Sequence, residues 1–334
     1  MKAIVMTGYG APKDVLELRT DHPKPLRKKG EVLVAVRATS INPGECKVRQ
    51  GILPKGMIKV PQILGCDVAG EVLETDPTSK FKVGDRVFGC TGQILSDPWG
   101  TYAELVSAKE DRLLAIPDGV SFEQAAAMPI AGMTAWQALA PSMPLQGKRV
   151  LVHAGAGGIG HFAVQIAKAQ GAYVATTCSG RNVEFVTQEL GADLAIDYTK
   201  DKFEEVAGAP YDLVLDLVGE EPRSWPLLKK NGRMAVISWD KMVEGKSGGG
   251  LVFAIVWRIM KMKTSSALGL CPKYDSVAQE YGSGKGLEDL VKLVAAGSVK
   301  VHIERVVMLE QIPEAHEYSE QGRTRGKVVV SLQP

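Results

Sequence analysis

The most constraining feature of this sequence is a glycine turn set between a strand and a helix. Gly155, Gly157 and Gly160 form a G-x-G-x-x-G pattern between an apolar run, RVLVHA, and a helix-like run, GHFAVQIAKAQG. Glycines allow a tight turn and a close backbone approach, and the free N–H groups at a helix start can bind a pyrophosphate. A glycine-rich turn with a purely structural role is the alternative. The strand, turn and helix context favours a dinucleotide-binding site.

The segment after residue 148 alternates short apolar strands with helical segments. After the first strand and helix, the expected strands are YVATTC, DLAIDY, YDLVLDLVG and GRMAVIS, with SSALGL (265–270) closing the sheet. VEFVTQELG, between YVATTC and DLAIDY, is expected to be a helix. Such alternation is typical of a parallel sheet with crossover helices. We therefore expect an α/β fold with a doubly wound Rossmann sheet.

The first third of the chain is rich in strands and turns. Segments such as GEVLVAVRATSINPG and KVGDRVFG are typical of an antiparallel, barrel-like module. Ser121 and Gln124 form a capping box before FEQAAAMPIAGMTAWQAL, which we expect to be one helix. The tail resumes the strand and turn pattern of the first third. The expected domains are a first module at 1–126, a nucleotide-binding domain at 127–271 and a return to the first module at 272–334.

Composition and charge describe an ordinary globular chain. With 40 basic and 38 acidic side chains the formal net charge is +2, which names no polyanionic partner. The five cysteines are scattered and fit a reducing compartment better than a disulfide framework. The N-terminus lacks the pattern of a secretory signal. We therefore expect a cytoplasmic protein, with an organelle as the alternative.

The longest apolar run outside the nucleotide region is LVFAIVWRIM (251–260). It is about half the roughly 20 residues that a membrane-spanning helix needs, so no transmembrane segment is expected. We expect this run to pack on the protein itself or on a subunit partner. Binding at a membrane interface, helped by Arg258, Lys261 and Lys263, is the alternative.

The residues after the second expected strand, CSGRN, distinguish between the two nicotinamide dinucleotides. An NAD site places a carboxylate near this point to bind the ribose 2′-hydroxyl, but here no acidic residue precedes Glu184. Arg181 can pair with a 2′-phosphate, and the Ser179 hydroxyl can donate a hydrogen bond to it. NADP(H) is therefore favoured, with a merely solvated Arg181 as the alternative. Tyr198, which ends the third strand, either reaches the adenine end of the cofactor or only packs.

Several motifs occur in an order that resembles the medium-chain dehydrogenase/reductase superfamily, in particular its zinc-independent quinone oxidoreductase branch, the zeta-crystallin-like family. The resemblance covers almost the whole chain. It implies a chaperonin-10-like, mainly antiparallel catalytic barrel built from both chain ends, a Rossmann domain and an active-site cleft between them. The motifs that carry it are INPGECKVRQG, LGCDVAGEV, VGDRVFG, WGTYAEL, AGMTAWQAL, AGAGGIG, TCSGRN, LGADLAIDY and RGKVVV.

Zinc-bearing relatives of this superfamily place a Cys and a His where this chain has Asn42 and Cys66. A catalytic zinc needs three protein ligands and an open fourth position, which a lone thiol does not supply. We therefore expect no metal site and no zinc cofactor, and we interpret Cys66 as a small core residue. Without zinc to polarise an alcohol, alcohol oxidation is not expected.

The resemblance also implies roles for individual residues. Asn42 would lie near the nicotinamide and the substrate, although an Asn before Pro43 also fits a plain turn. Glu45 replaces the Asp of the family's usual N-P-V-D pattern and would orient the substrate or relay a proton. The residues expected to contact the cofactor are Asn42, Thr134, Gly155, Ala156, Gly157, Gly158, Ile159, Ser179, Arg181, Tyr198 and Lys327.

These features predict an NADPH-dependent quinone oxidoreductase that passes a hydride to quinones or related electron-poor acceptors. One alternative is an NADPH-dependent reductase of 2-alkenals, enones or enoyl thioesters. Another is an NADPH-regulated protein that binds single-stranded nucleic acid, as some zeta-crystallin relatives do. The resemblance further implies a homodimer that associates through the edge of the Rossmann sheet, with SSALGL as the expected edge strand.

Overall fold

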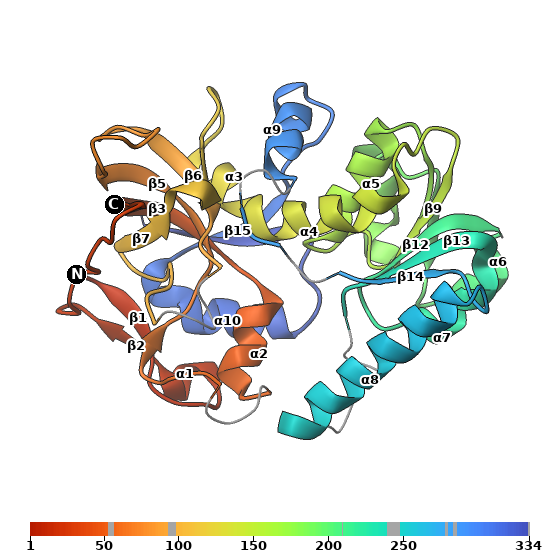
Figure 1. The fold of residues 1–334 in the computed structure, drawn as a ribbon, viewed down its shortest axis with the longest axis horizontal. Helices are drawn as coiled ribbons and strands as arrows, with labels where there is room; N and C mark the ends of the chain where they lie inside the picture. The colour runs from red at the N-terminus through yellow and green to blue at the C-terminus, as the bar shows by residue number, and fades with distance from the viewer. Residues whose placement is uncertain are drawn as a thin grey trace. The chain divides into compact units, whose positions relative to one another are not determined.

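The computed structural model describes residues 1–52, 57–92, 98–208, 210–238, 248–277, 280–282 and 286–332. The chain forms two compact units (Figure 1). The first unit comprises Met1–Ile130, Glu280–Val291 and Val301–Pro334, and the second comprises Ala131–Gln279 and Lys292–Lys300. The division into domains at residues 126 and 271, expected from the sequence, remains a prediction.

The first unit contains two sheets, which confirms the mainly antiparallel module built from both chain ends. A short sheet has the strand order β2-β1-β4, and a larger sheet has the order β15-β16-β3-β5-β6-β8, with β7 also paired to β3. Of the pairs in these two sheets, only β15 with β16 is parallel. The strands are β1 Ala3–Met6, β2 Leu16–Arg19, β3 Glu31–Ile41, β4 Gln62–Ile63, β5 Asp67–Glu74, β6 Arg86–Cys90, β7 Leu105–Lys109, β8 Leu113–Ala115, β15 Ile303–Met308 and β16 Lys327–Ser331.

Helix α2 (Pro43–Gln50) has clear local causes. Asn42 is its N-cap in extended conformation, Pro43 fills the first helical position, and Glu45 stands at the third. Gly51 ends the helix with φ 76°, a left-handed conformation that favours glycine. The other described helices of this unit are α1 Pro12–Val15, α3 Phe122–Ala127, α10 Ile312–Glu320 and the 3₁₀ turns Glu110–Arg112 and Leu309–Gln311, while α9 Leu287–Ala295 crosses the unit boundary.

The single helix expected over residues 122–139 is two helices, so that expectation was wrong. Helix α3 ends at Ala127 and α4 (Pro129–Leu139) begins at Pro129. The capping box of α3 is present, since Gln124 N–H donates to the Ser121 hydroxyl at 3.1 Å. Proline has no N–H to continue the hydrogen bonds of α3, so a new helix starts at Pro129, although Met128 itself keeps right-handed helical geometry.

The second unit has a six-stranded sheet in which every pair is parallel. Its order, β11-β10-β9-β12-β13-β14, is the 3-2-1-4-5-6 order of a doubly wound Rossmann sheet. This confirms the expected fold class. The strands are β9 Arg149–Val152, β10 Tyr173–Cys178, β11 Leu194–Asp197, β12 Tyr211–Asp216, β13 Leu228–Val236 and β14 Lys273–Ser276. The helices are α4, α5 Gly160–Ala169, α6 Phe203–Val206, α7 Glu221–Ser224, α8 Gly248–Ala267, a π-helix at Phe185–Glu189 and 3₁₀ turns at Ala140–Ser142, Gly180–Asn182 and Trp225–Leu227.

The edge strand of this sheet is β14, not SSALGL, so the prediction for residues 265–270 was wrong. The first half of that segment is the end of α8, which packs against β14 (Figure 1). No proline or glycine stops this helix before Gly269, whose φ is 69°. The edge strand therefore forms after that glycine.

Helix α8 contains the apolar run 251–260. None of the described side chains of the run is buried, and Phe253, Trp257 and Met260 are more than half exposed within the chain. Met262, just after the run, is buried. Packing of the run on the protein itself or on a subunit partner therefore remains a prediction. None of the described helices combines the length and apolarity needed to cross a membrane.

Candidate active site and nucleotide site

A buried polar cluster lies at the start of α2 in the first unit. Its four side chains are Asn42, Glu45, Asp67 and Lys327, each at most 5% exposed. Strand register explains why they meet. Val328 of β16 pairs with Ile41 of β3, which places Lys327 beside Asn42, and β5, which begins at Asp67, pairs with β3 on its other edge.

Hydrogen bonds join these four side chains into one network. Lys327 Nζ donates to Asn42 Oδ1 at 2.5 Å and lies 3.8 Å from Asp67 Oδ2. Asn42 Nδ2 donates to Asp67 Oδ2 at 2.9 Å and to Glu45 Oε1 at 3.2 Å. The Glu45 carboxyl also accepts the backbone N–H of Asn42 at 2.5 Å. The Asn42 amide thus has one orientation, with its oxygen toward the ammonium and its nitrogen toward the carboxyl groups.

Asp67 is the anchor of this network, and sequence analysis missed it. Its Oδ2 accepts the Ser40 hydroxyl at 2.5 Å, and its Oδ1 accepts the backbone N–H of Ile130 at 2.8 Å. Ile130 can donate because it lies in the first turn of α4, directly after Pro129, where N–H groups lack helical partners. The available signal was the acidic residue directly after Cys66. Sequence analysis interprets Cys66 as the position of an absent zinc ligand and does not consider its neighbour Asp67.

Burial changes the protonation of this cluster. It raises the pKa of the Glu45 carboxyl from 4.5 to about 8, and Asp67 adds to the rise, while Lys327 and Asn42 oppose it. Burial also lowers the pKa of the Lys327 ammonium, against the opposing effect of Asp67 and Glu45. At neutral pH Glu45 therefore retains its proton. The cluster is equipped to hold one transferable proton out of contact with bulk water.

The glycine turn of the second unit lies between β9 and α5, as expected. A Cβ on Gly155 would lie 1.9 Å from Thr176 Oγ1, and a Cβ on Gly160 would lie 2.1 Å from the Ala154 carbonyl oxygen. A Cβ on Gly157 would meet only that same oxygen, at 3.3 Å. Packing therefore requires the first and third glycines, whereas Gly157 keeps open a space that the chain does not fill.

The exposure of the turn residues also separates the tightly packed first glycine from the more open Gly157. Gly155 and Ala156 are buried, while Gly157, Gly158 and Ile159 are partly exposed directly before the first turn of α5. Partly exposed backbone at a helix N-terminus is the arrangement that binds a pyrophosphate. The residues present thus fit a dinucleotide.

Three more of the expected cofactor residues lie at the carboxyl edge of the same sheet. Ser179 follows the last residue of β10, Arg181 is exposed in the next turn, and Tyr198 follows the last residue of β11 with 58% exposure. The two strand ends are neighbours, because Tyr198 N–H donates to the Cys178 carbonyl at 3.1 Å. Thr134 is also in this unit, buried on α4.

Asp197 is a second acid that sequence analysis missed. It pairs with Cys178 in the parallel register of β10 and β11 and is 8% exposed. A Cβ on Gly180 would lie 2.6 Å from Asp197 Oδ2. The turn that carries Arg181 therefore lies against this carboxylate, and a side chain at position 180 would displace it.

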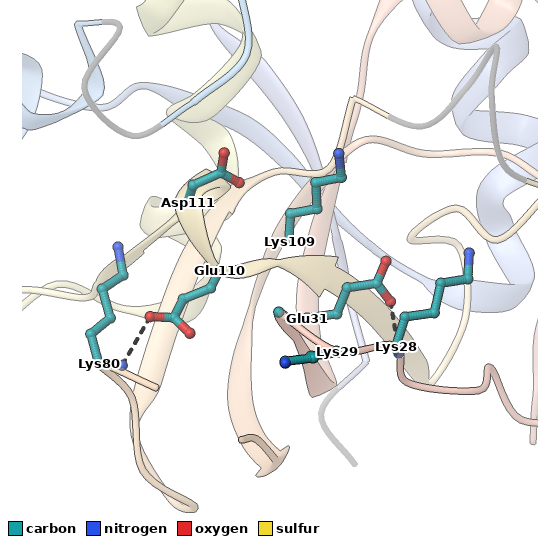
Figure 2. A pocket seen from close by; sticks show the side chains of 8 residues that line it. Lys28, Lys29, Glu31, Lys80, Lys109, Glu110 and Asp111 are labelled. Carbon is teal, nitrogen blue, oxygen red and sulfur yellow. Dashed lines mark hydrogen bonds between the residues drawn. The ribbon is translucent and has the colours of Figure 1, made fainter. Parts of the chain in front are cut away.

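A separate surface cavity of about 550 Å³ lies in the first unit (Figure 2). None of the predicted site residues lines it. Two of its three acids are engaged with nearby backbone: Glu31 accepts the Lys28 N–H at 3.1 Å and Glu110 accepts the Lys80 N–H at 2.9 Å. Its mixed charges do not define a ligand. The lining residues are Lys28, Lys29, Gly30, Glu31, Lys80, Lys109, Glu110 and Asp111.

Known proteins resemble this chain over its full length. Residues 28–118 match the alcohol dehydrogenase GroES-like domain, and residues 190–330 match the zinc-binding dehydrogenase family. The chloroplast envelope quinone oxidoreductase homolog of Arabidopsis thaliana is 34% identical over 99% of this chain and 98% of its own length. The chloroplastic NADPH-dependent alkenal/one oxidoreductase of the same plant is 37% identical over 71% of this chain and 62% of its own length.

The fold also matches a solved structure, the Escherichia coli quinone oxidoreductase complexed with NADPH. Its TM-score with this chain is 0.81, at 26% identity, and the match covers 99% of this chain and 100% of the bacterial one. Similarity of sequence and of fold therefore point to the same group of proteins.

Proposed function

This chain belongs to the quinone oxidoreductases of the medium-chain dehydrogenase/reductase superfamily and is an NAD(P)H-dependent oxidoreductase, and we propose that it transfers a hydride from NADPH to quinones or related electron-poor acceptors. The observation that carries the proposal is the buried Asn42–Glu45–Asp67–Lys327 network, in a chain whose glycine turn fits a dinucleotide. It supplies a protonated acid and a fixed cation where the family has its substrate site.

The choice of NADPH rests on the end of β10. The residues that follow β10 include no acid before Glu184, and the neighbouring Asp197 of β11 is 8% exposed and lies against Gly180. Arg181, by contrast, is exposed beside Ser179. A guanidinium and a hydroxyl suit a 2′-phosphate, which carries the extra negative charge of NADPH. The solved relative in complex with NADPH supports this choice.

NADPH, when bound, supplies the hydride. The chain itself then has to orient the acceptor and supply a proton to the oxygen or carbon that gains negative charge. The proton on Glu45 suits that task, because an acid with a pKa near the working pH donates most effectively. Asn42 holds the Glu45 carboxyl in place, and the Lys327 ammonium stabilises the carboxylate that the transfer leaves behind.

We propose further that this chemistry needs no zinc. The Lys327 ammonium already occupies the cationic position of the cluster, in contact with Asn42 and close to Asp67. A divalent cation among the same groups would be repelled by that charge. Asn42 also offers only a neutral amide at the position where zinc-bearing relatives have a thiolate ligand.

The test is oxidation of NADPH and of NADH by the purified protein, with 1,4-benzoquinone, 9,10-phenanthrenequinone and a 2-alkenal, with and without a chelator. We expect turnover that prefers NADPH and a quinone and that the chelator does not change. Loss of turnover with the chelator, in a protein that circular dichroism shows to remain folded, would contradict the zinc-free mechanism.

The same assay decides between the acceptors. Faster turnover of the 2-alkenal than of either quinone would favour the second candidate, an alkenal or enone reductase, which the 37% identical relative supports. An enoyl thioester assayed in parallel tests the third acceptor class. Tight NADPH binding with no turnover, together with salt-sensitive binding of single strands, would favour the nucleic-acid-binding alternative.

A further inference from the structure

A cluster of three metal-ligating side chains lies in the first unit and includes none of the predicted site residues. Cys46 belongs to α2, and His316 and Glu320 stand one turn apart on α10, which packs against α2. One donor atom from each residue lies within 4.8 Å of the other two. A thiol, an imidazole and a carboxyl group, with two of them spaced i and i+4 on a helix, are typical donors for a transition metal.

The His316 ring is held as a metal ligand would be. The ring is fully buried, and its Nε2 lies 3.1 Å from the Tyr102 hydroxyl. Its Nδ1 is buried too and has no hydrogen-bond partner among the described residues. A ligating histidine commonly donates its other ring N–H to a polar neighbour, which fixes the ring and leaves one lone pair for the metal. A buried nitrogen left unsatisfied otherwise destabilises the fold.

Cys46 is a poor nucleophile but a suitable ligand. It is 3% exposed. Burial raises the pKa of its thiol to about 12, with Glu45 and Glu320 adding to the rise and Arg49 opposing it. Without a metal the thiol therefore keeps its proton, and a bound cation would replace that proton. The fixed charge of Arg49 favours the resulting thiolate.

Glu320 gives the cluster access to solvent. Its side chain is 26% exposed, whereas its ion-pair partner Arg49 is almost fully buried. The carboxylate has two oxygens, so one can stay with Arg49 while the other binds a cation. One thiolate and one carboxylate neutralise a divalent ion, which limits its repulsion by the neighbouring guanidinium.

We propose that Cys46, His316 and Glu320 bind a zinc ion, with water as the fourth ligand, and that this ion fastens α2 to the C-terminal helix α10. Mixed sulfur, nitrogen and oxygen donors suit zinc better than magnesium or calcium. A tetrahedral site with bonds of about 2.0–2.3 Å places its donors about 3.5 Å apart, so the donors, which lie within 4.8 Å of one another, would have to move closer on binding. Three protein ligands leave a fourth position to water, but the position between α2 and α10 gives the ion a stabilising role, and none of its ligands belongs to the Asn42 network.

The test is titration of the chelator-treated full-length protein with Co²⁺, which reports a thiolate ligand through its charge-transfer absorption. We expect one equivalent to bind with that absorption and to be displaced by Zn²⁺. Cys46→Ser should abolish the absorption, whereas Cys271→Ser, the same change at a half-buried thiol of the second unit, should preserve it. Glu320→Gln alters a partly exposed side chain and should weaken binding at least about tenfold.

Thermal unfolding provides a readout that does not depend on the thiolate absorption. Added Zn²⁺ should raise the Tm of the wild type and of Cys271→Ser and leave that of Cys46→Ser unchanged. Absence of stoichiometric Co²⁺ binding would overturn the proposal, and so would an absorption that survives Cys46→Ser. If Cys46→Ser does not fold, unchanged Co²⁺ affinity in Glu320→Gln overturns it. Neither readout measures turnover, so this test and the test of the oxidoreductase fail separately.

Discussion

Lys327 Nζ donates a hydrogen bond to Asn42 Oδ1 across 285 residues of chain. The bond joins the last strand, β16, to the residue that caps α2, and the register of β16 on β3 puts the two residues side by side. Because both side chains are buried away from water, the Lys327 ammonium and the Asn42 amide oxygen serve as hydrogen-bond partners for each other. Closing the first unit from both chain ends is therefore what assembles the candidate active site.

Substitution Asn42→Ala should lower turnover about 10- to 100-fold while the protein remains folded, because Glu45 and Lys327 lose the amide that orients them. The measurement is kcat with NADPH and a quinone, with circular dichroism to check the fold. Ser121→Ala is the control, since it removes a helix cap outside the network. It should cost about 1 kcal/mol of stability and leave turnover unchanged. Unchanged turnover in Asn42→Ala would remove that residue from the site.

The activity should fall about tenfold per pH unit as the pH rises above about 8, because the donor Glu45 then loses its proton. Glu45→Gln should lower turnover at neutral pH about 10²-fold or more and abolish this alkaline decrease. The matched control Glu310→Gln changes an exposed glutamate of the same unit and should keep the wild-type profile. An alkaline decrease that persists in Glu45→Gln would assign the proton to another group.

The same group predicts how stability depends on pH. The pKa of Glu45 is higher in the folded protein than its ordinary value of 4.5. The folded state therefore binds the proton more tightly, and this contribution to stability is complete below about pH 4.5 and is lost as the pH rises to about 8. Urea unfolding across this window should show a smaller decrease for Glu45→Gln than for the wild type. Equal slopes for the two proteins would contradict the raised pKa.

The nucleotide-binding half was the more predictable part of the fold. Its glycine turn and its alternating strands and helices are local in sequence, so residue patterns identify them, whereas the cofactor roles of the side chains after β10 and β11 remain predictions. The failed prediction at 265–270 is also local: Ser, Ala and Leu suit a strand or a helix, and the helix wins because nothing ends α8 before Gly269.

The candidate active site was less predictable because its contacts are distant in sequence. Asn42, Glu45 and Lys327 were identified through family resemblance, but their roles remain predictions. Neither their mutual hydrogen bonds nor the part played by Asp67 follows from spacing, since sheet register alone brings them together. Cys46 and His316 gave no sequence signal for the same reason.

Cofactor preference can be tested at Arg181. Arg181→Ala should lower kcat/KM for NADPH about 10- to 100-fold, the loss expected for a charge-assisted hydrogen bond, and leave that for NADH nearly unchanged. Lys168→Ala is a control of the same unit and charge, because Lys168 pairs with Asp193 at the far end of α5 from the glycine turn. An unchanged ratio of the two kcat/KM values in Arg181→Ala would show that Arg181 is only solvated.

The two kinds of glycine in the turn should respond differently to alanine. In Gly155→Ala the new methyl group would lie 1.9 Å from Thr176 Oγ1, so the glycine turn must move away from β10 and the second unit should be strongly destabilised. In Gly157→Ala the one close neighbour of the new methyl group is the Ala154 carbonyl oxygen at 3.3 Å, so the protein should fold almost normally. Its methyl group would fill the space left for the pyrophosphate, so NADPH affinity should fall at least about tenfold.

Calorimetric titration with NADPH and thermal unfolding of both variants separate the loss of cofactor binding from the loss of stability. A Gly157→Ala protein that is stable and binds NADPH normally would show that the dinucleotide does not approach this turn.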